Sequence, residues 1–469
     1  MSTSVRANTA PPRDRLEPEI LKLGAVLVLG TILAVLDSTI VNVGIESIRR
    51  DFDSSLATVQ WISTGYLLAF ALVAPVSGWA TNRFGAKTTW MVSVACFVLG
   101  SALCGMAWSA GSLILFRVLQ GIGGGLIQPI GQSMIAQAAG PQRIGRVMSL
   151  LIIPLTFAPA LGPVVGGVLI GTLSWQWIFY VNIPLGAITL LLAARVLPAS
   201  EPEGGQKLDV LGLLLISPGL AGLIYGFSET GNGRGFEDTA VHAPIALGAL
   251  LLIAYAVHAL RSKGTPVLDL RLFARKAFSN AVLTSFLVGA ALFSSMFLLP
   301  LYYQQARGED PLHAGLLLIP QDIGIAVAMF FAGRLTGRFG LRAVMLTGIA
   351  LSMAGTLAYT QVGSDPAGLL LTGGLFVRGI GLGAAMNPMI TAVFQSVERH
   401  QMPQAAGINN VVHRIGGSLG TATLVIVLQH QSAAGDSAED GFATAFWWAL
   451  GVSALTLLPA LALPGKSRG

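Results

Sequence analysis

Residues 78–90 read GWATNRFGAKTTW, and residues 333–345 read GRLTGRFGLRAVM. Both stretches follow the pattern G-x-x-T-x-R-F-G-x-[KR]. Each stretch is short and basic, and its glycines permit a tight turn between two helix ends. One copy of such a pattern would be weak evidence. Two copies in matching places indicate that the chain consists of two related halves.

The chain around the repeated stretches is strongly apolar. It has 469 residues, of which 53% are hydrophobic and 11% are charged, and its mean hydropathy is +0.71. Soluble domains contain about 25% charged residues, so a soluble globular protein is excluded. Runs of about 20 apolar residues recur along the chain, and such runs predict membrane-spanning helices. The runs lack the alternation of apolar and polar residues that is typical of membrane β-barrels.

Fourteen apolar runs are present, and the chain is therefore predicted to be an all-α integral membrane protein. The first run is too long for a signal-peptide core and has no small-residue cleavage site, so we expect it to be a mature helix. The runs cover residues 22–44, 58–80, 88–108, 111–138, 146–170, 176–197, 208–227, 241–260, 278–302, 312–334, 341–360, 367–395, 404–429 and 442–463.

The distribution of the 28 lysines and arginines predicts the orientation. If the runs alternate in direction, most of these residues fall on one side, which the positive-inside rule assigns to the cytoplasm. An even number of helices then places both termini in the cytoplasm. The net charge of +6 reflects this basic inner face and requires no nucleic-acid partner. The opposite side carries Arg49, Arg50, Arg234 and Arg307.

Eight runs separate the two repeated stretches, so both stretches lie on the same side of the membrane. This arrangement is a parallel repeat, which is found in transporters whose halves are related by an axis along the membrane normal.

Four motifs resemble signatures of a known family. They are LDSTIVNV (36–43), GWATNRFGAK (78–87), RVLQGIGGG (117–125) and LGPVVGG (161–167). Together they resemble the fourteen-helix drug:proton antiporters of the major facilitator superfamily, the EmrB/QacA-like branch, over essentially the whole chain. This resemblance implies two six-helix bundles with two extra helices between them, and export by exchange.

The resemblance also implies roles for two groups of residues. The resemblance implies that the repeated loops control the change of conformation. It also implies that the fifth helix carries the antiporter signature. The family has an aspartate in the loop where this chain has Asn82 and Gly337, so the charge latch attributed to that aspartate is not carried over. The loop residues are Gly78, Arg83, Gly85, Lys87, Gly333, Arg338 and Gly340, and the antiporter residues are Gly162, Pro163, Gly166 and Gly167.

The extra helix pair is placed by comparison with twelve-helix members, which have six helices between the two loops. The additional pair, roughly residues 208–260, has no intramembrane charge, and we expect it to be peripheral with no direct transport role. The predicted divisions are an arm (1–21), the first bundle (22–200), a linker with the extra helices (201–277), the second bundle (278–464) and a tail (465–469).

Glycines in the inner runs predict close helix contacts. Proline bends a helix, and small residues let a neighbouring helix approach. We expect these positions to serve inner helices that rock against one another. Besides the antiporter residues, the pairs are Gly121 and Gly125, Gly379 and Gly383, and Gly416 and Gly420.

Six ionisable residues lie deep within the runs: Asp37, Arg117, Asp322, Arg378, His413 and Arg414. Such residues usually face a bundle interior or a wet cavity and mark a pathway, although a buried pair can also serve packing alone. Asp37 and Arg117 lie at comparable depths. Because arginine keeps its charge, the pair makes a proton switch in which protonation of Asp37 removes its attraction to Arg117.

The remaining candidates are assigned to the substrate cavity. Asp322 lies near the membrane midplane and is either a second proton site or a counter-charge for a cationic substrate. Histidine ordinarily titrates near physiological pH, so His413 is a candidate proton carrier. A lone histidine is, however, more often a hydrogen-bonded packing group. The predicted proton-coupling residues are thus Asp37, Arg117 and Asp322, and the predicted cavity residues are Asn42, Asp322, Arg378, His413 and Arg414.

The sequence contains no phosphate loop, no H-E-x-x-H motif and no cysteine–histidine metal cluster. We therefore expect no enzyme activity, cofactor or metal, and energy from an ion gradient, with protons favoured over sodium. Two interpretations stay open: an exporter of hydrophobic, cationic small molecules, and a carrier of an endogenous lipid or secondary metabolite. A non-transport membrane protein is disfavoured. We expect a monomer in the cell inner membrane whose partners are a small-molecule substrate, protons and lipids.

Overall fold

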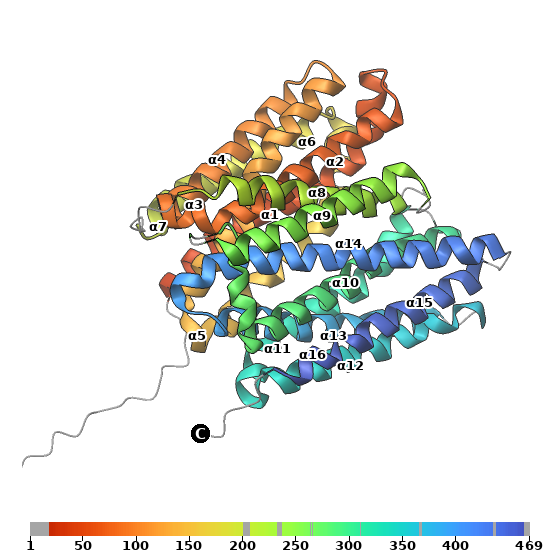
Figure 1. Cartoon of the computed structure of the whole chain (residues 1–469). Coiled ribbons are helices and arrows are strands. Elements are labelled where there is room, and N and C mark those ends of the chain that lie inside the picture. The colour runs from red at the N-terminus through yellow and green to blue at the C-terminus, as the bar shows by residue number, and fades with distance from the viewer. Residues whose placement is uncertain are drawn as a thin grey trace, which may run out of the picture.

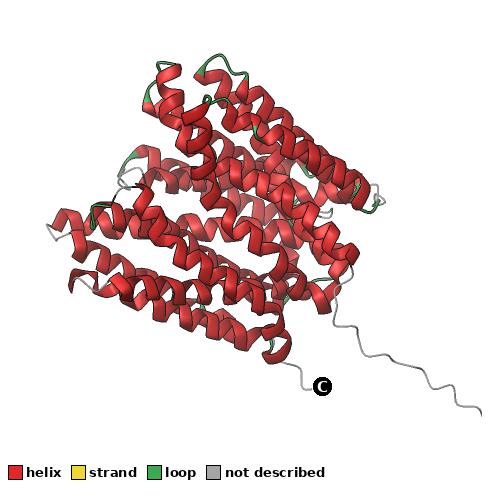
Figure 2. Ribbon diagram, turned by 180° about the vertical axis from the view of Figure 1, so that it is seen from behind, coloured by secondary structure: helices red, strands yellow, loops and turns green. Residues whose placement is uncertain are grey.

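The computed structural model describes residues 18–199, 207–231, 237–262, 264, 266–309, 311–364, 368–434 and 438–463. Within these ranges every regular element is a helix (Figures 1 and 2). Most of the predicted arm (1–21) and the predicted tail (465–469) lie outside the described residues. The prediction of an all-α membrane fold is confirmed.

The first bundle centres on one long element, α5, against which α1, α2 and α4 pack. α5 includes the predicted runs 111–138 and 146–170, and the two parts join at Gly140, whose φ of 69° breaks the helical geometry. The bundle consists of α1 (Pro18–Asp51), α2 (Leu56–Val73), the short α3 (Ser77–Phe84), α4 (Ala86–Gly105), α5 (Ala110–Thr172), the short α6 (Trp177–Tyr180) and α7 (Asn182–Val196), with a 3-10 turn, η1, at Ala74–Val76.

The second bundle repeats this arrangement, with α10 packed on α14, and α11 and α12 packed on α13. Its elements are α10 (Lys276–Gln305), α11 (Pro311–Phe339), α12 (Leu341–Leu357), α13 (Gly368–Gln395), α14 (Met402–Ala434), α15 (Ala438–Leu455) and the short α16 (Leu457–Leu461). Three 3-10 turns accompany them: η2 (Leu270–Ala274), η3 (Ala358–Ser364) and η4 (Arg399–Gln401).

Thirteen spans among the described residues are long and apolar enough to cross a membrane. The predicted run 146–170 is the second part of α5, but the side chains of residues 148–160 lie outside the described set. Large apolar side chains cover the outer surface. Leu250 and Ile253 on α9, for example, are 62% and 63% exposed. Lipid is the solvent that accommodates such a surface.

The two repeated loops have the same backbone conformation. Gly85 and Gly340 have φ values of 84° and 86°, a region that L side chains rarely adopt. The N–H of Gly85 donates to the carbonyl of Thr81, and the N–H of Gly340 donates to that of Thr336, both at 2.9 Å. In both halves, glycine therefore ends one helix and allows the next to begin at once.

The bundles are joined at the end that carries these loops, which is the predicted cytoplasmic end. The guanidinium of Arg399 donates to the carbonyl of Gln137 at 2.9 Å, and the Asn410 amide donates to Gln132 Oε1 at 3.1 Å. In Figures 1 and 2 the ribbons of the two bundles lie close together at this end and diverge toward the other. The structure is therefore closed at the predicted cytoplasmic end.

The extra helices, α8 (Val210–Gly231) and α9 (Thr239–Arg261), form a hairpin. α8 contacts both α2 of the first bundle and α14 of the second, so it lies across the seam between them (Figure 1). Its polar contact with α2 is a hydrogen bond from Ser217 Oγ to the Leu72 carbonyl at 2.6 Å. α9 packs mainly on α8, whereas α8 touches both bundles, and the expectation that the pair has no direct transport role stays a prediction.

Candidate functional site

The structure brings Asp37 and Arg117 together in the interior of the first bundle. Arg117 Nη1 donates to Asp37 Oδ2 at 2.5 Å, and the two side chains are 1% and 0% exposed. Asp37 comes from the middle of α1 and Arg117 from the first part of α5. The pair is thus a buried ion pair between two helices that pack tightly on each other.

Two amides complete the coordination of the Asp37 carboxylate. Gln120 Nε2 and Asn182 Nδ2 both donate to Asp37 Oδ1, at 2.9 and 2.8 Å. Gln120 Oε1 in turn accepts from Arg117 Nη1 at 2.7 Å. Every group around the carboxylate is a donor, and one donor is cationic, so the arrangement suits an ionised aspartate.

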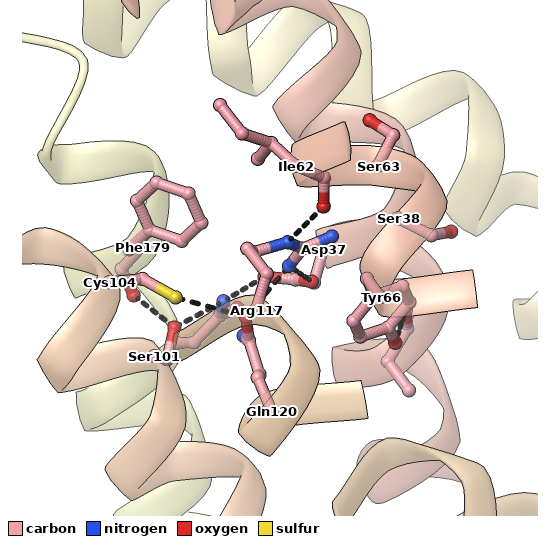
Figure 3. A network of polar contacts seen from close by, with 12 residues as sticks. Asp37, Ser38, Ile62, Ser63, Tyr66, Ser101, Cys104, Arg117, Gln120 and Phe179 are labelled. Carbon is pink, nitrogen blue, oxygen red and sulfur yellow. Dashed lines mark hydrogen bonds and ion pairs between the residues drawn. The ribbon is translucent and has the colours of Figure 1, made fainter. Parts of the chain in front are cut away.

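The network extends to α2 and α4 (Figure 3). Arg117 Nε donates to the Ile62 carbonyl at 3.2 Å, and the guanidinium lies 4.1 Å from the centre of the Tyr66 ring. Asn182 also donates to Ser101 Oγ at 2.9 Å. Five helices of the first bundle therefore contribute to a single polar cluster around Asp37.

Three members of this cluster, Gln120, Asn182 and Ser101, were not predicted. Gln120 lies one helical turn after Arg117, and this spacing was the available signal. Asn182 and Ser101 carry no charge, and uncharged polar residues occur in most apolar runs. Only the packing of α4 and α7 reveals that Asn182 donates to Asp37 and that Ser101 accepts from Asn182.

Arg378 lies in the matching part of α13, where it aligns with Gln120 when Gly121 is matched to Gly379, and its partners are neutral. Its Nη1 donates to Gln321 Oε1 at 2.5 Å, its Nε donates to Thr356 Oγ1 at 3.1 Å, and its Nη2 donates to Ser295 Oγ. Arg378 is 4% exposed, and no carboxylate among the described residues pairs with it. The side chain is enclosed by its own bundle, so in this state it does not line a space between the bundles.

Asp322 lies on α11 directly after Gln321 and two residues after Pro320, which is inside the helix. It is partly buried and has no hydrogen bond or ion pair with any described residue. Because it belongs to the second bundle, it is not part of the Asp37 cluster.

His413 and Arg414 are neighbours on α14 but face different surroundings. His413 Nδ1 lies 2.9 Å from the Ser285 carbonyl of α10, and its ring is 5.8 Å from that of Phe293. His413 is thus a hydrogen-bonded packing group within the second bundle. The guanidinium of Arg414 lies 4.3 Å from the centre of the Phe70 ring on α2, across the seam.

The other predicted site residues are at the ends of the helices or near their surface. Asn42 is exposed and accepts a hydrogen bond from Ser63 Oγ at 3.1 Å. Lys87 Nζ donates to the carbonyls of Ala194 and Leu197, at 2.9 and 2.8 Å, and so caps α7. Arg83 is exposed, and Asn82 forms no hydrogen bond or ion pair with the described residues.

The glycines pack helices within a bundle. A Cβ atom on Gly162 would lie 2.0 Å from Thr39 Oγ1 of α1, and a Cβ atom on Gly121 would lie 2.5 Å from the Tyr66 carbonyl of α2. The pair beginning at Gly379 approaches α11, and the pair beginning at Gly416 approaches α10. In this state each of these contacts is internal to one bundle, and the expectation that the glycines serve helices that rock against one another stays a prediction. Gly167 meets nothing within 4 Å, and the Pro163 side chain lies outside the described set.

Comparisons with known proteins agree with this architecture. The family model for the Major Facilitator Superfamily matches residues 27–421. The chain is 39% identical over 420 residues to the multidrug resistance protein B homolog of Mycobacterium tuberculosis strain H37Rv, covering 89% of this chain and 78% of that protein. It is 31% identical over 418 residues to the methylenomycin A resistance protein of Streptomyces coelicolor, covering 88% and 87%.

Solved structures with low sequence identity show the same fold. The proton:xylose symporter XylE, bound to 6-bromo-6-deoxy-D-glucose, superposes with a TM-score of 0.65 at 14% identity, covering 95% of this chain and 96% of that one. The human organic anion transporter MFSD10 superposes with a TM-score of 0.65 at 15% identity, covering 93% and 100%. The resemblance inferred from the four motifs is confirmed, and the chain belongs to the Major Facilitator Superfamily of membrane transporters.

Proposed function

We propose that this multi-pass membrane protein is a proton-coupled exporter of hydrophobic, cationic small molecules that works by alternating access. The proposal places it in the cell inner membrane as a monomer, with both termini in the cytoplasm. The relatives named for multidrug resistance and methylenomycin A resistance support drug export. The observation that carries the proton coupling is the fully buried ion pair of Asp37 and Arg117.

The chemistry of the cluster supplies a two-state element. An ionised Asp37 attracts Arg117 and accepts from two amides. A proton on Asp37 cancels the charge attraction and converts charge-assisted hydrogen bonds into weaker neutral ones. Because α1, α4, α5 and α7 all contribute to this cluster, their packing responds to the charge on one carboxyl group. Exchange follows if the proton and the substrate favour different packings.

Asp322 supports the cationic character of the substrate. It lies on α11 in the second bundle, partly buried and without a cation among the described residues. Carriers of this architecture bind substrate near the midplane between their halves. A carboxylate at that depth attracts an organic cation strongly, because the local dielectric constant is low.

Reconstitution into sealed vesicles with an imposed pH gradient tests the proposal. The wild-type protein and Asp37→Asn are compared on a panel of cationic dyes and native lipids, after size-exclusion chromatography has established that the variant is folded. We expect the wild-type protein to transport dyes in response to the gradient and Asp37→Asn to lose this response. Full pH-driven transport by the variant would refute the role of Asp37. Transport of lipids but not dyes would favour the alternative of an endogenous lipid substrate.

A further inference from the structure

Three arginines lie at membrane depth, and they differ in their partners. Arg117 is paired with a carboxylate, and Arg378 donates to three neutral oxygen atoms. Arg414 forms no hydrogen bond or ion pair with any described residue. Its guanidinium makes a cation–π contact with the Phe70 ring, 4.3 Å from the ring centre. Arg414 is therefore the one of these three whose N–H donors are not satisfied within the described part of the chain.

The position of Arg414 explains where these donors point. α14 packs on α10 of its own bundle. It also packs on α3 and α5 of the first bundle and on the extra helix α8, so it forms one side of the seam. Arg414 projects from α14 toward α2 of the opposite bundle and is partly buried. Guanidinium has five N–H donors in a rigid, forked geometry that matches an acidic group. A charge at this depth usually faces a wet cavity or a ligand.

We infer that Arg414 is the anion-recognition residue of the transport site and that the protein also accepts amphiphilic substrates bearing an acidic group, such as a carboxylate. This inference rests on the proposed transport function and deepens it. The acidic group accepts two N–H bonds from Arg414, while the apolar body of the substrate lies against aromatic and aliphatic side chains such as Phe70.

Asp322 is a second charged residue of the second bundle that has no ion-pair partner among the described residues. Asp322 is on α11, which packs on α13 and α5, whereas Arg414 is on α14, which packs on α10 and α8. Neither residue has an ion-pair partner among the described residues, and the two are not paired with each other. The second bundle thus has a carboxylate on one helix and a guanidinium on another, neither of them in an ion pair with a described residue.

Matched fluorescent probes test this inference. The probes are 11-(dansylamino)undecanoic acid and its methyl ester, which share the fluorophore and the chain and differ in charge. We expect the purified wild-type protein to bind the acid more tightly than the ester. Arg414→Gln should lower the affinity for the acid by about tenfold and leave the ester unchanged, because only the acid makes charge-assisted hydrogen bonds. Arg414→Lys should retain part of the preference.

Arg334→Gln is the matched control. Arg334 is an exposed arginine with a ring contact inside its own helix, 5.8 Å from the centre of the Phe330 ring. This substitution removes the same charge and the same type of contact at an exposed position whose ring partner is on its own helix, and it should change neither affinity.

Two outcomes would overturn the inference. One is equal binding of the acid and the ester by the wild-type protein. The other is an equal loss of both probes in Arg414→Gln, which would mark a structural role. Export of cationic dyes by the same wild-type preparation separates this inference from the proposed function. Dye export without an acid preference would overturn only the anion site, whereas an acid preference without pH-driven export would overturn only the proton-coupled function.

Discussion

The ion pair between Asp37 and Arg117 should dominate the stability of the first bundle. Both groups are fully buried, so removing one leaves the other charge without its partner. Breaking a buried pair in this way costs about 3–5 kcal/mol of unfolding free energy. Asp37→Asn and Arg117→Gln should each show a loss of this size, although both remain folded at low temperature because Gln120 and Asn182 still offer hydrogen bonds.

The double variant Asp37→Asn/Arg117→Gln should be more stable than the sum of the single losses predicts. It leaves no uncompensated charge, and amides take the place of both charged groups. We expect a coupling free energy of about 2–4 kcal/mol, taken as most of the cost of one unpaired buried charge. The assay is denaturant unfolding of the purified protein in detergent, followed by tryptophan fluorescence, for the wild-type protein and the three variants.

A surface pair provides the control cycle. Arg49 and Glu46 are joined at 2.8 Å near the end of α1, but their side chains are 38% and 51% exposed. The cycle of Glu46→Gln and Arg49→Gln should show almost no coupling, because water screens exposed pairs. Additive losses at Asp37 and Arg117, like those at the surface pair, would refute the reasoning that these residues act as one charge-paired unit.

Three further predictions concern the loop, the second bundle and the glycine contacts. Arg83→Ala should lower turnover and leave substrate dissociation constants near the wild-type values, measured by transport and by equilibrium binding; a large loss of affinity at normal turnover would contradict this. Asp322→Asn should weaken monovalent and divalent organic cations by about tenfold and neutral substrates much less, and equal losses in parallel binding titrations would rule out a counter-charge. Gly379→Ala should destabilise the protein by about 1–3 kcal/mol, because its Cβ would lie 2.1 Å from the Gln321 carbonyl. Gly167→Ala, with nothing within 4 Å, is the matched control for detergent unfolding.

Hydropathy predicts where helices cross the membrane but not where they end. The first run was predicted to stop at residue 44, whereas α1 continues to Asp51. In this extension Glu46 pairs with Arg49 and Arg50, both at 2.8 Å, on the helix surface. Charged residues that leave the membrane therefore continue the helix, and a hydropathy criterion treats them as loop. The same criterion divides α5 in two, and this division agrees with the break in helical geometry at Gly140.

The sequence predicted the charged residues of the candidate site but not its neutral ones. Asp37 and Arg117 stand out in apolar runs because charge is expensive in lipid, and their similar depth predicted their proximity. Their neutral partners could not be found in this way, since asparagine, glutamine and serine carry no comparable penalty. Nor could the sequence distinguish His413, which packs against α10, from Arg414, which faces the seam, because adjacent residues on a helix point in directions about 100° apart.

The two halves have the same helix packing but different charged residues in their interiors. Arg117 and Arg378 both precede a glycine-rich contact with the second helix of their half, at Gly121 against α2 and at Gly379 against α11. The first helix of each half supplies the partner, which is the Asp37 carboxylate on α1 and the Ser295 hydroxyl on α10. A proton cancels the charge on a carboxylate, whereas the Ser295 hydroxyl carries no charge, so of these two arginine contacts only that of Arg117 changes its charge balance on protonation. The carboxylate of the second half, at Asp322, lies outside the contacts of Arg378 and is left available to a substrate. Under the proposed function, we therefore expect the proton-dependent step in the first bundle and the recognition of charged substrate in the second, with both acting on the seam between the bundles.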